Sequence, residues 1–68
     1  MTLRIELEQE DDGRWIAEVL ELPGAMVYGT AREGTEIRAK ALALRTIAEH
    51  LGHGEVGSDL TDIVFMVC

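Results

Sequence analysis

Cysteine, proline and aromatic residues are all scarce in this sequence, and their scarcity excludes several classes of protein. The one cysteine, Cys68, is the last residue, so no internal disulfide can form and no zinc-binding spacing exists. This usage suits a reducing compartment, and we expect a cytoplasmic protein. No apolar run reaches the ~20 residues of a membrane span, and the N-terminus lacks the basic and apolar regions of a signal peptide. We therefore expect neither a membrane anchor nor a cleaved leader.

The core has few aromatic side chains to draw on. Trp15, Tyr28 and Phe65 are the only ones in 68 residues, although 47% of the residues are hydrophobic. The core must therefore be mainly aliphatic. A domain of this size buries only about 60% of the surface that its unfolded chain exposes. We expect part of the apolar surface to lie at a subunit interface, which predicts a homo-oligomer.

Positive charge is also scarce, since six Lys and Arg residues against 13 Asp and Glu residues give a net charge of −7. Nucleic-acid binding depends on clustered Lys and Arg side chains, so an acidic chain is a poor nucleic-acid binder. A basic protein is the better electrostatic partner; the alternative is that the acids only keep a small domain soluble. Seven acids lie within residues 1–22, opposed there by Arg4 and Arg14 alone: Glu6, Glu8, Glu10, Asp11, Asp12, Glu18 and Glu21.

The first third of the chain predicts a hairpin of two strands. Residues 2–8 alternate between apolar and polar side chains, which is typical of a half-buried strand. Asp12 and Gly13 predict a type I′ turn, in which both residues have positive φ. Residues 14–20 form the second strand, and apolar residues occur on both of its faces. We therefore expect a subunit or a partner to cover part of its outer face.

A short third strand and one helix follow. The Pro-Gly pair at residues 23–24 ends the second strand, and residues 25–28 form the third. Thr30 and Glu33 predict a capping box, which begins a helix that ends near Gly52. Apolar residues recur along this helix at spacings of four and three, which predicts a stripe packed on the sheet. The stripe consists of Ile37, Ala41, Leu44, Ala48 and Leu51, with Ile47 alongside.

The last strand completes the fold. Residues 53–59 predict a polar loop, and residues 62–67 a strand that is apolar on both faces. The order predicts one α+β domain over residues 1–68, an antiparallel β-β-β-α-β fold with one helix packed on the sheet. A short run that is apolar on both faces is buried on two sides or lies at an interface. We assign the oligomer interface to Ile63, Phe65 and Val67.

Four short motifs follow one another along the chain. They are an acidic hairpin at residues 10–13, Trp-Ile-Ala-Glu-Val from residue 15, Glu-Leu-Pro-Gly at residues 21–24, and Gly-Thr at residues 29–30 before the helix. Together they resemble the HicB-like antitoxin family. Residues 40–55 resemble the helix end of one branch of that family, so the resemblance covers residues 3–67.

The resemblance implies an oligomeric domain that neutralises a small basic mRNA-cleaving toxin by covering its surface. Many members add a C-terminal DNA-binding module, whereas this sequence closes at Cys68, and we expect no such module. The alternative is a solitary self-associating regulatory or ligand-sensing domain with no toxin partner. The residues that we assign to partner binding are Glu6, Glu8, Asp11, Asp12, Trp15 and Glu18.

Catalytic chemistry finds little support. Ser58 and Cys68 have no base at a predictable distance. The family fold has been likened to a degenerate ribonuclease-H core, but that chemistry needs buried acids that bind two metals, and the strand acids are predicted to face outward. The acids at residues 10–12 and the pair His50 and His53 fit a solvated turn and surface histidines better than cation sites. We expect no enzyme, metal or cofactor.

Trp15 has two interpretations. A lone aromatic residue on the strand after a hairpin is commonly a core residue. Tryptophan is also frequent among the residues that dominate binding energy, which makes Trp15 a candidate interface anchor. Met26 and Tyr28 are candidates for the same patch.

Overall fold

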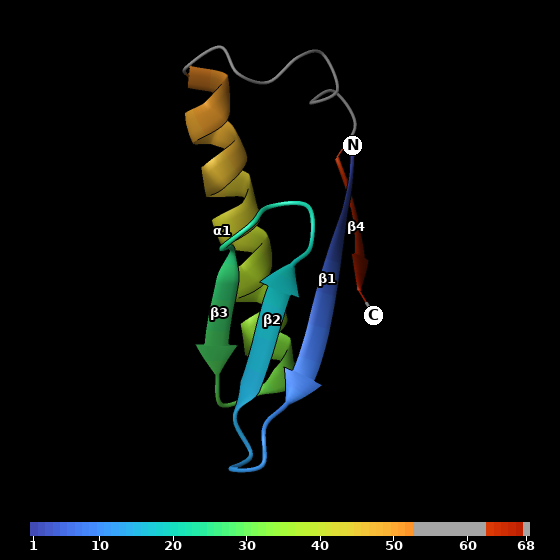
Figure 1. Cartoon of the computed structure of the whole chain (residues 1–68), viewed down its shortest axis with the longest axis vertical. Coiled ribbons are helices and arrows are strands. Elements are labelled where there is room, and N and C mark those ends of the chain that lie inside the picture. The colour runs from blue at the N-terminus through green and yellow to red at the C-terminus, as the bar shows by residue number, and fades with distance from the viewer. Residues whose placement is uncertain (53–62, 68) are drawn as a thin grey trace.

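The computed structural model describes residues 1–52 and 63–67, with the side chains of residues 51 and 52 left aside. It contains a sheet with the strand order β3-β2-β1-β4 and one helix packed on a face of that sheet (Figure 1). The predicted α+β class and the β-β-β-α-β order are confirmed. The predicted loop at residues 53–59 and Cys68 lie outside the described residues. The elements are β1 (Thr2–Gln9), β2 (Trp15–Val19), β3 (Met26–Gly29), α1 (Arg32–Gly52) and β4 (Val64–Val67).

The sheet is mixed rather than wholly antiparallel. β1 pairs antiparallel with β2, and β2 pairs antiparallel with β3, as expected for hairpin-connected strands. β4 instead runs parallel to β1, with Thr2 opposite Val64 and Ile5 opposite Val67. The helix ends at the end of the sheet where β1 begins, as Figure 1 shows. A strand that follows α1 and pairs with β1 therefore runs in the direction of β1.

The β1–β2 hairpin has a three-residue loop, not the predicted two-residue type I′ turn. The amide of Gly13 donates to the carbonyl of Glu10 at 2.9 Å, and the amide of Glu10 donates to the carbonyl of Arg14 at 2.7 Å. Gly13 has a φ of 92°, whereas Asp12 does not have positive φ. This is a type I turn followed by a glycine bulge. The Asp12 carboxylate favours it by accepting the amide of Arg14 at 3.0 Å.

The predicted Pro-Gly turn joins β2 to β3. The amide of Ala25 donates to the carbonyl of Leu22 at 2.9 Å, with Pro23 and Gly24 as the two central residues. Gly24 has a φ of 84°, which is the conformation that a type II turn requires at its third residue. The turn brings Ala25 back into the core, where it is buried.

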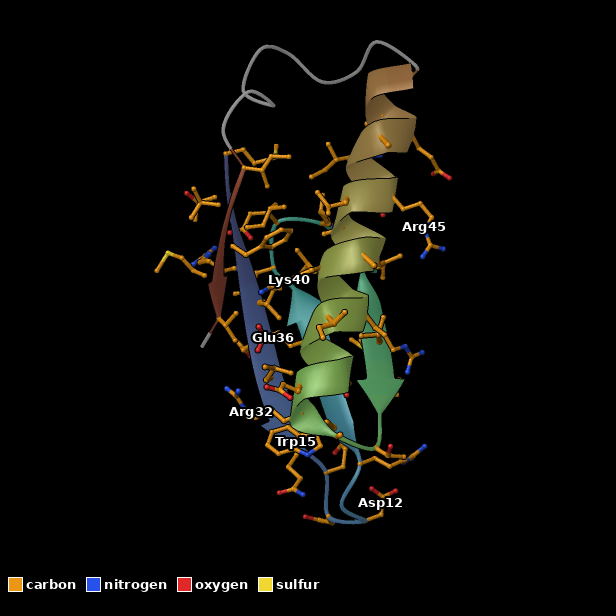
Figure 2. All side chains as sticks on the ribbon, turned by 180° about the vertical axis from the view of Figure 1, so that it is seen from behind. Asp12, Trp15, Arg32, Glu36, Lys40 and Arg45 are labelled. Carbon is orange, nitrogen blue, oxygen red and sulfur yellow. The ribbon has the colours of Figure 1, made fainter. Side chains whose placement is uncertain are left out.

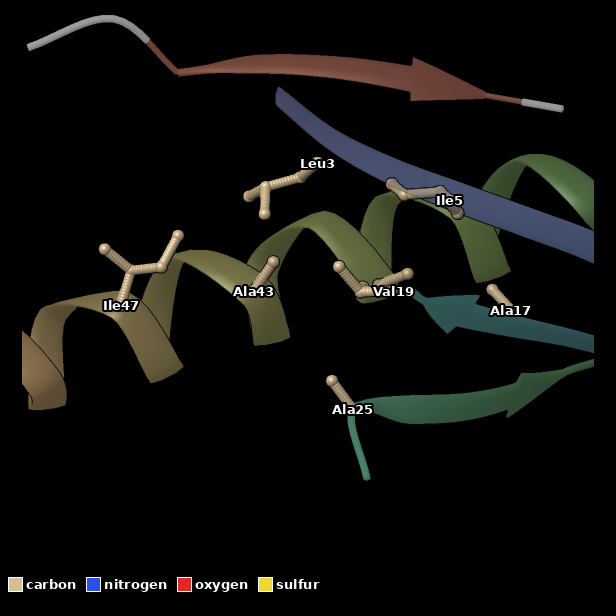
Figure 3. Packing of buried hydrophobic residues seen from close by; sticks show 8 residues of the cluster. Leu3, Ile5, Ala17, Val19, Ala25, Ala43 and Ile47 are labelled. Carbon is tan, nitrogen blue, oxygen red and sulfur yellow. The ribbon is translucent and has the colours of Figure 1, made fainter. Parts of the chain in front are cut away.

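The helix packs on the sheet through a face of small residues (Figure 3). Most of the predicted stripe is wrong, since Ile37, Ala41, Leu44 and Ala48 are exposed, and Ile37 retains 63% of its accessible surface. Ile47, predicted alongside the stripe, is buried, and the side chain of Leu51 lies outside the described residues. Small side chains let the helix axis approach the sheet closely, whereas the larger ones at positions 37 and 44 would hold it away. The buried helix positions recur every four residues: Thr35, Ala39, Ala43 and Ile47. They pack against the predicted inner face of β1 and against β2, with Leu3, Ile5, Ala17 and Val19 buried there.

The helix begins one residue later than a Thr30 cap requires. Its first residue is Arg32, and the first turn is joined by the amide and hydroxyl of Thr35, which both donate to the carbonyl of Ala31. In the described part of the chain no hydrogen bond joins Thr30 to Glu33, so the predicted capping box is wrong. The close approach of Gly29 to Thr35 sets where the chain turns from β3 into the helix.

Candidate functional site

The face of the sheet that points away from α1 carries a group of acids. Leu3 and Ile5 of β1 are buried beneath the helix, so the alternate residues of β1 point to the opposite face. Glu6 lies opposite Glu18 of β2, and Glu8 is the next outward residue along β1. We call Glu6, Glu8 and Glu18 the acidic face. The structure therefore brings together three of the six residues assigned to partner binding.

None of these three carboxylates forms an ion pair within the residues that the structure describes, and Arg4, which shares their face of the sheet, pairs with Glu21 instead. The ion pairs there use other acids, namely Asp12, Glu21 and Glu36. Glu6 and Glu18 are directly opposite each other on neighbouring strands, and like charges in that position destabilise a sheet. A local conflict of this kind is more typical of a functional surface than of a purely structural one.

Apolar side chains flank the acidic face on both sides. On one side, Met26 lies opposite Glu18, and Tyr28 lies opposite Ile16. On the other side, Val64 and Met66 of β4 lie opposite residues of β1 that share this face. Met26 and Tyr28 retain 42% and 47% of their accessible surface. Methionine and tyrosine are enriched in protein interfaces, so this combination suits a protein-binding surface.

The hairpin acids contribute less free charge than their sequence suggests. Asp12 forms an ion pair with Arg14, whose Nε lies 2.8 Å from Oδ2. The amide and then the guanidinium of Arg14 donate to this carboxylate and hold the pKa of Asp12 below its ordinary value. Arg14 also lies 5.7 Å from the centre of the Tyr28 ring. Asp11 is exposed at the hairpin tip, and the structure does not place it on the acidic face.

Trp15 lies on the other side of the sheet. Its neighbours in the sheet are Gln9 and Gly29, which share the helix-side face, and its ring is half-buried. Arg32 at the start of α1 lies 6.0 Å from the ring centre, as Figure 2 shows at the base of the helix. Met26 and Tyr28 belong with the acidic face instead. The structure thus separates the patch proposed for Trp15, Met26 and Tyr28 into two faces.

Two of the three β4-region residues predicted to form an oligomer interface point toward the core of their own chain. Ile63 and Phe65 pack against the hydrophobic core of their own chain. Lys40 lies 5.7 Å from the centre of the Phe65 ring and forms a 3.0 Å ion pair with Glu36 (Figure 2). The role of Ile63, Phe65 and Val67 in an oligomer stays a prediction. The most exposed side chains of β4 are Val64 and Met66, which sequence reasoning did not single out.

Within residues 1–52 and 63–67 there is no pocket and no group of three residues suited to a metal ion. Of the two histidines that we interpret as surface residues, His50 is exposed and His53 lies outside the described residues. The same part of the chain contains no helix with the length and hydrophobicity of a membrane span.

Comparisons with known families, with curated proteins and with solved structures each found no match.

Proposed function

We propose that this chain is a non-enzymatic protein-binding module that docks a small basic protein on its acidic face. The observation that carries the proposal is the group formed by Glu6, Glu8 and Glu18, three carboxylates that form no ion pair in the described structure. Basic side chains of a partner relieve the repulsion between Glu6 and Glu18. Met26 and Tyr28 beside them supply apolar contact area.

The sequence motifs make an antitoxin-like role the most specific form of this proposal. The partner is then a small basic mRNA-cleaving toxin, which the domain inhibits by covering its surface. The resemblance to HicB-like antitoxins supports this form, and so do the acidic composition and the net charge of −7. Docking by charge speeds the encounter of two proteins and suppresses wrong partners.

The proposal is tested with the short basic chains encoded beside the gene. Each is co-expressed with this chain, complex formation is measured by co-purification, and the association rate of the purified proteins is measured at low and at high salt. We expect one basic chain to co-purify and its association rate to fall steeply with salt, because salt screens exposed charges over distances of about 10 Å. The proposal fails if no neighbouring basic chain binds, or if the association rate is the same at both salt concentrations.

One observation favours the alternative of a self-associating domain without a toxin. Apolar side chains remain exposed on two separate elements, at Ile37 and Leu44 of α1 and at Val64 and Met66 of β4. A protein that only self-associates forms the same assembly whether or not a basic neighbour is present. It also binds no basic chain in the co-purification experiment.

A further inference from the structure

The outer edge of β4 presents unpaired backbone groups in a defined pattern. The amide of Val64 donates to the carbonyl of Met1 at 2.9 Å, so the backbone of Val64 is directed at β1. In a parallel pair, alternate residues direct both backbone groups to the same neighbour. Val64 and Met66 therefore face β1, and the backbone groups of Ile63, Phe65 and Val67 point to the open side. No other strand of the described sheet lies beyond β4.

Within residues 63–67, this edge lacks two features that usually protect an edge strand, charged side chains and proline. The helix lies over β2 and β3 and less over β1, so it shields β4 little (Figure 1). Val64 and Met66, on the face of the sheet that points away from α1, retain 54% and 53% of their accessible surface.

Among residues 1–52 and 63–67, the charges nearest to this edge do not oppose a second copy. Arg4, which lies opposite Met66, is ion-paired with Glu21. Lys40, which lies near Phe65, is ion-paired with Glu36. The acids of the acidic face lie on β1 and β2, toward the middle of the sheet. They are therefore not concentrated at β4.

We infer that a second copy of this chain pairs with β4 along this edge, antiparallel and about a twofold axis at Phe65. The two Phe65 residues exchange both backbone hydrogen bonds, Ile63 lies opposite Val67, and Val64 lies opposite Met66. Such an interface is self-complementary, as a twofold axis requires. Of the possible registers, this one pairs every residue from 63 to 67 with an apolar residue. A register centred on Val64 would set Asp62 against Met66.

The dimer joins the two sheets into one of eight strands, because each copy contributes a four-stranded sheet. A twofold axis that relates two edge strands runs perpendicular to the sheet. Both helices therefore lie on one side, and both acidic faces lie on the other. Val64 and Met66 of the two copies form an apolar strip between them. The inference goes beyond the proposed function, since it concerns the strand edge and holds with or without a basic partner.

The assembly is tested by light scattering at micromolar concentration. We expect wild-type protein to have twice the chain mass of 7.5 kDa, and the double variant Val64→Lys/Met66→Lys to have the mass of one chain with an unchanged circular dichroism spectrum. These side chains are exposed, so lysine there leaves the fold intact and charges the strand edge. The matched control is Met26→Lys, an exposed methionine on the opposite edge strand, which stays dimeric. A wild-type mass of one chain, or a folded double variant that remains dimeric, overturns the inference.

The register is tested by cross-linking in a Cys68→Ser background. In the register centred on Phe65, Val64 and Met66 of the two copies form a non-hydrogen-bonded pair with Cα atoms about 4.5 Å apart, which a disulfide spans. Val64→Cys mixed with Met66→Cys therefore gives a covalent dimer on mild oxidation. Two copies of either variant alone are offset by two residues, roughly 7 Å along the strand, and cross-link poorly. Equal cross-linking of Val64→Cys alone overturns the register.

Discussion

At the scale of single residues, the contact between Gly29 and Thr35 controls how β3 meets the helix. A Cβ atom added at Gly29 would collide with the hydroxyl oxygen of Thr35, which is itself buried. That hydroxyl donates to the carbonyl of Ala31 at 2.6 Å, so it cannot turn away without losing its hydrogen bond. The absence of a side chain at position 29 therefore permits the close packing of α1 on the sheet.

We expect Gly29→Ala to lower the free energy of unfolding by about 1–3 kcal/mol, the usual cost of overpacking a tight contact. The matched control is Gly34→Ala, which makes the same change near the start of α1. A Cβ atom at Gly34 meets nothing within 4 Å, so this variant should gain roughly 0.5–1 kcal/mol from the better helix propensity of alanine. Urea denaturation of both variants measures the difference. Equal stability of the two variants contradicts this account of Gly29.

A second residue-scale prediction concerns acid stability. The Glu21 carboxylate accepts the amide of Arg4 at 2.7 Å and its Nε at 2.6 Å. These bonds, the amide first, lower the pKa of Glu21 from its ordinary value of 4.5. A carboxylate with a lowered folded-state pKa stabilises the fold fully above the unfolded-state pKa and loses this effect as pH falls through the folded-state value. The loss therefore occurs below about pH 4.5.

Glu21→Gln should remove this part of the pH dependence. We expect the free energy of unfolding to fall more for the wild type than for the variant as pH is lowered from 6. The stability curves of the two proteins should converge at low pH, where Glu21 is protonated. Thermal unfolding over that pH range measures it. Parallel curves for the two proteins would show that the bonds from Arg4 do not contribute to stability. The pair is exposed, so the effect is small compared with core substitutions.

At the scale of elements, most boundaries followed from local sequence signals. Alternation predicted β1 and its buried face, and the Pro-Gly pair predicted the turn before β3. The hairpin type was wrong, because the Asp12 side chain bonds the backbone two residues on and favours a longer loop. Local residue preferences set these features, so a sequence pattern can reveal them.

The face of α1 that is buried differs from the face that its hydrophobic sequence pattern predicts. The helix face with Ile37, Ala41 and Leu44 carries larger apolar side chains than the face with Thr35, Ala39 and Ala43. The residues of the first face are nevertheless exposed to solvent. The sheet is instead contacted by Thr35, Ala39 and Ala43. Sequence periodicity shows that a helix has an apolar side but not how near its axis must come to a sheet. Here the close approach at Gly29 selects the face with small side chains.

This choice of face gives a prediction for the element. Ala43→Leu should lower the free energy of unfolding by about 1–3 kcal/mol. Ala43 lies on the face of α1 that packs on the sheet and is fully buried, so a larger side chain there overpacks the contact. Ala41→Leu is the matched control, since Ala41 is exposed on the same helix. It should change stability by less than about 0.5 kcal/mol. If Ala41→Leu is the more damaging variant, then the predicted stripe and not the observed face packs on the sheet.

At the scale of the whole molecule, the acidic face could be predicted only in part. Alternation placed Glu6, Glu8 and Glu18 outward, and the structure brings them together. Trp15 could not be assigned to a face, because its strand is apolar on both sides. Val64 and Met66 were missed, since their place depends on β4 pairing with β1, a contact between residues more than 60 positions apart in sequence. Local patterns do not specify such a pairing.

Charge-neutral variants test most directly whether the acidic face binds a basic partner. The measurement is the association rate between a basic chain encoded beside the gene and each of three proteins. These are the wild type, Glu6→Gln/Glu18→Gln, and Glu33→Gln/Glu49→Gln. The last variant removes the same number of charges from exposed positions on α1.

We expect Glu6→Gln/Glu18→Gln to associate at least tenfold more slowly than wild type at low salt, while its stability rises by about 0.2–1 kcal/mol because a repulsive pair is gone. The control variant should keep a rate within a factor of about three of wild type, since only its net charge differs. Equal slowing by both double variants would show that net charge alone steers the partner. An unchanged rate for Glu6→Gln/Glu18→Gln would contradict the acidic face as the binding surface.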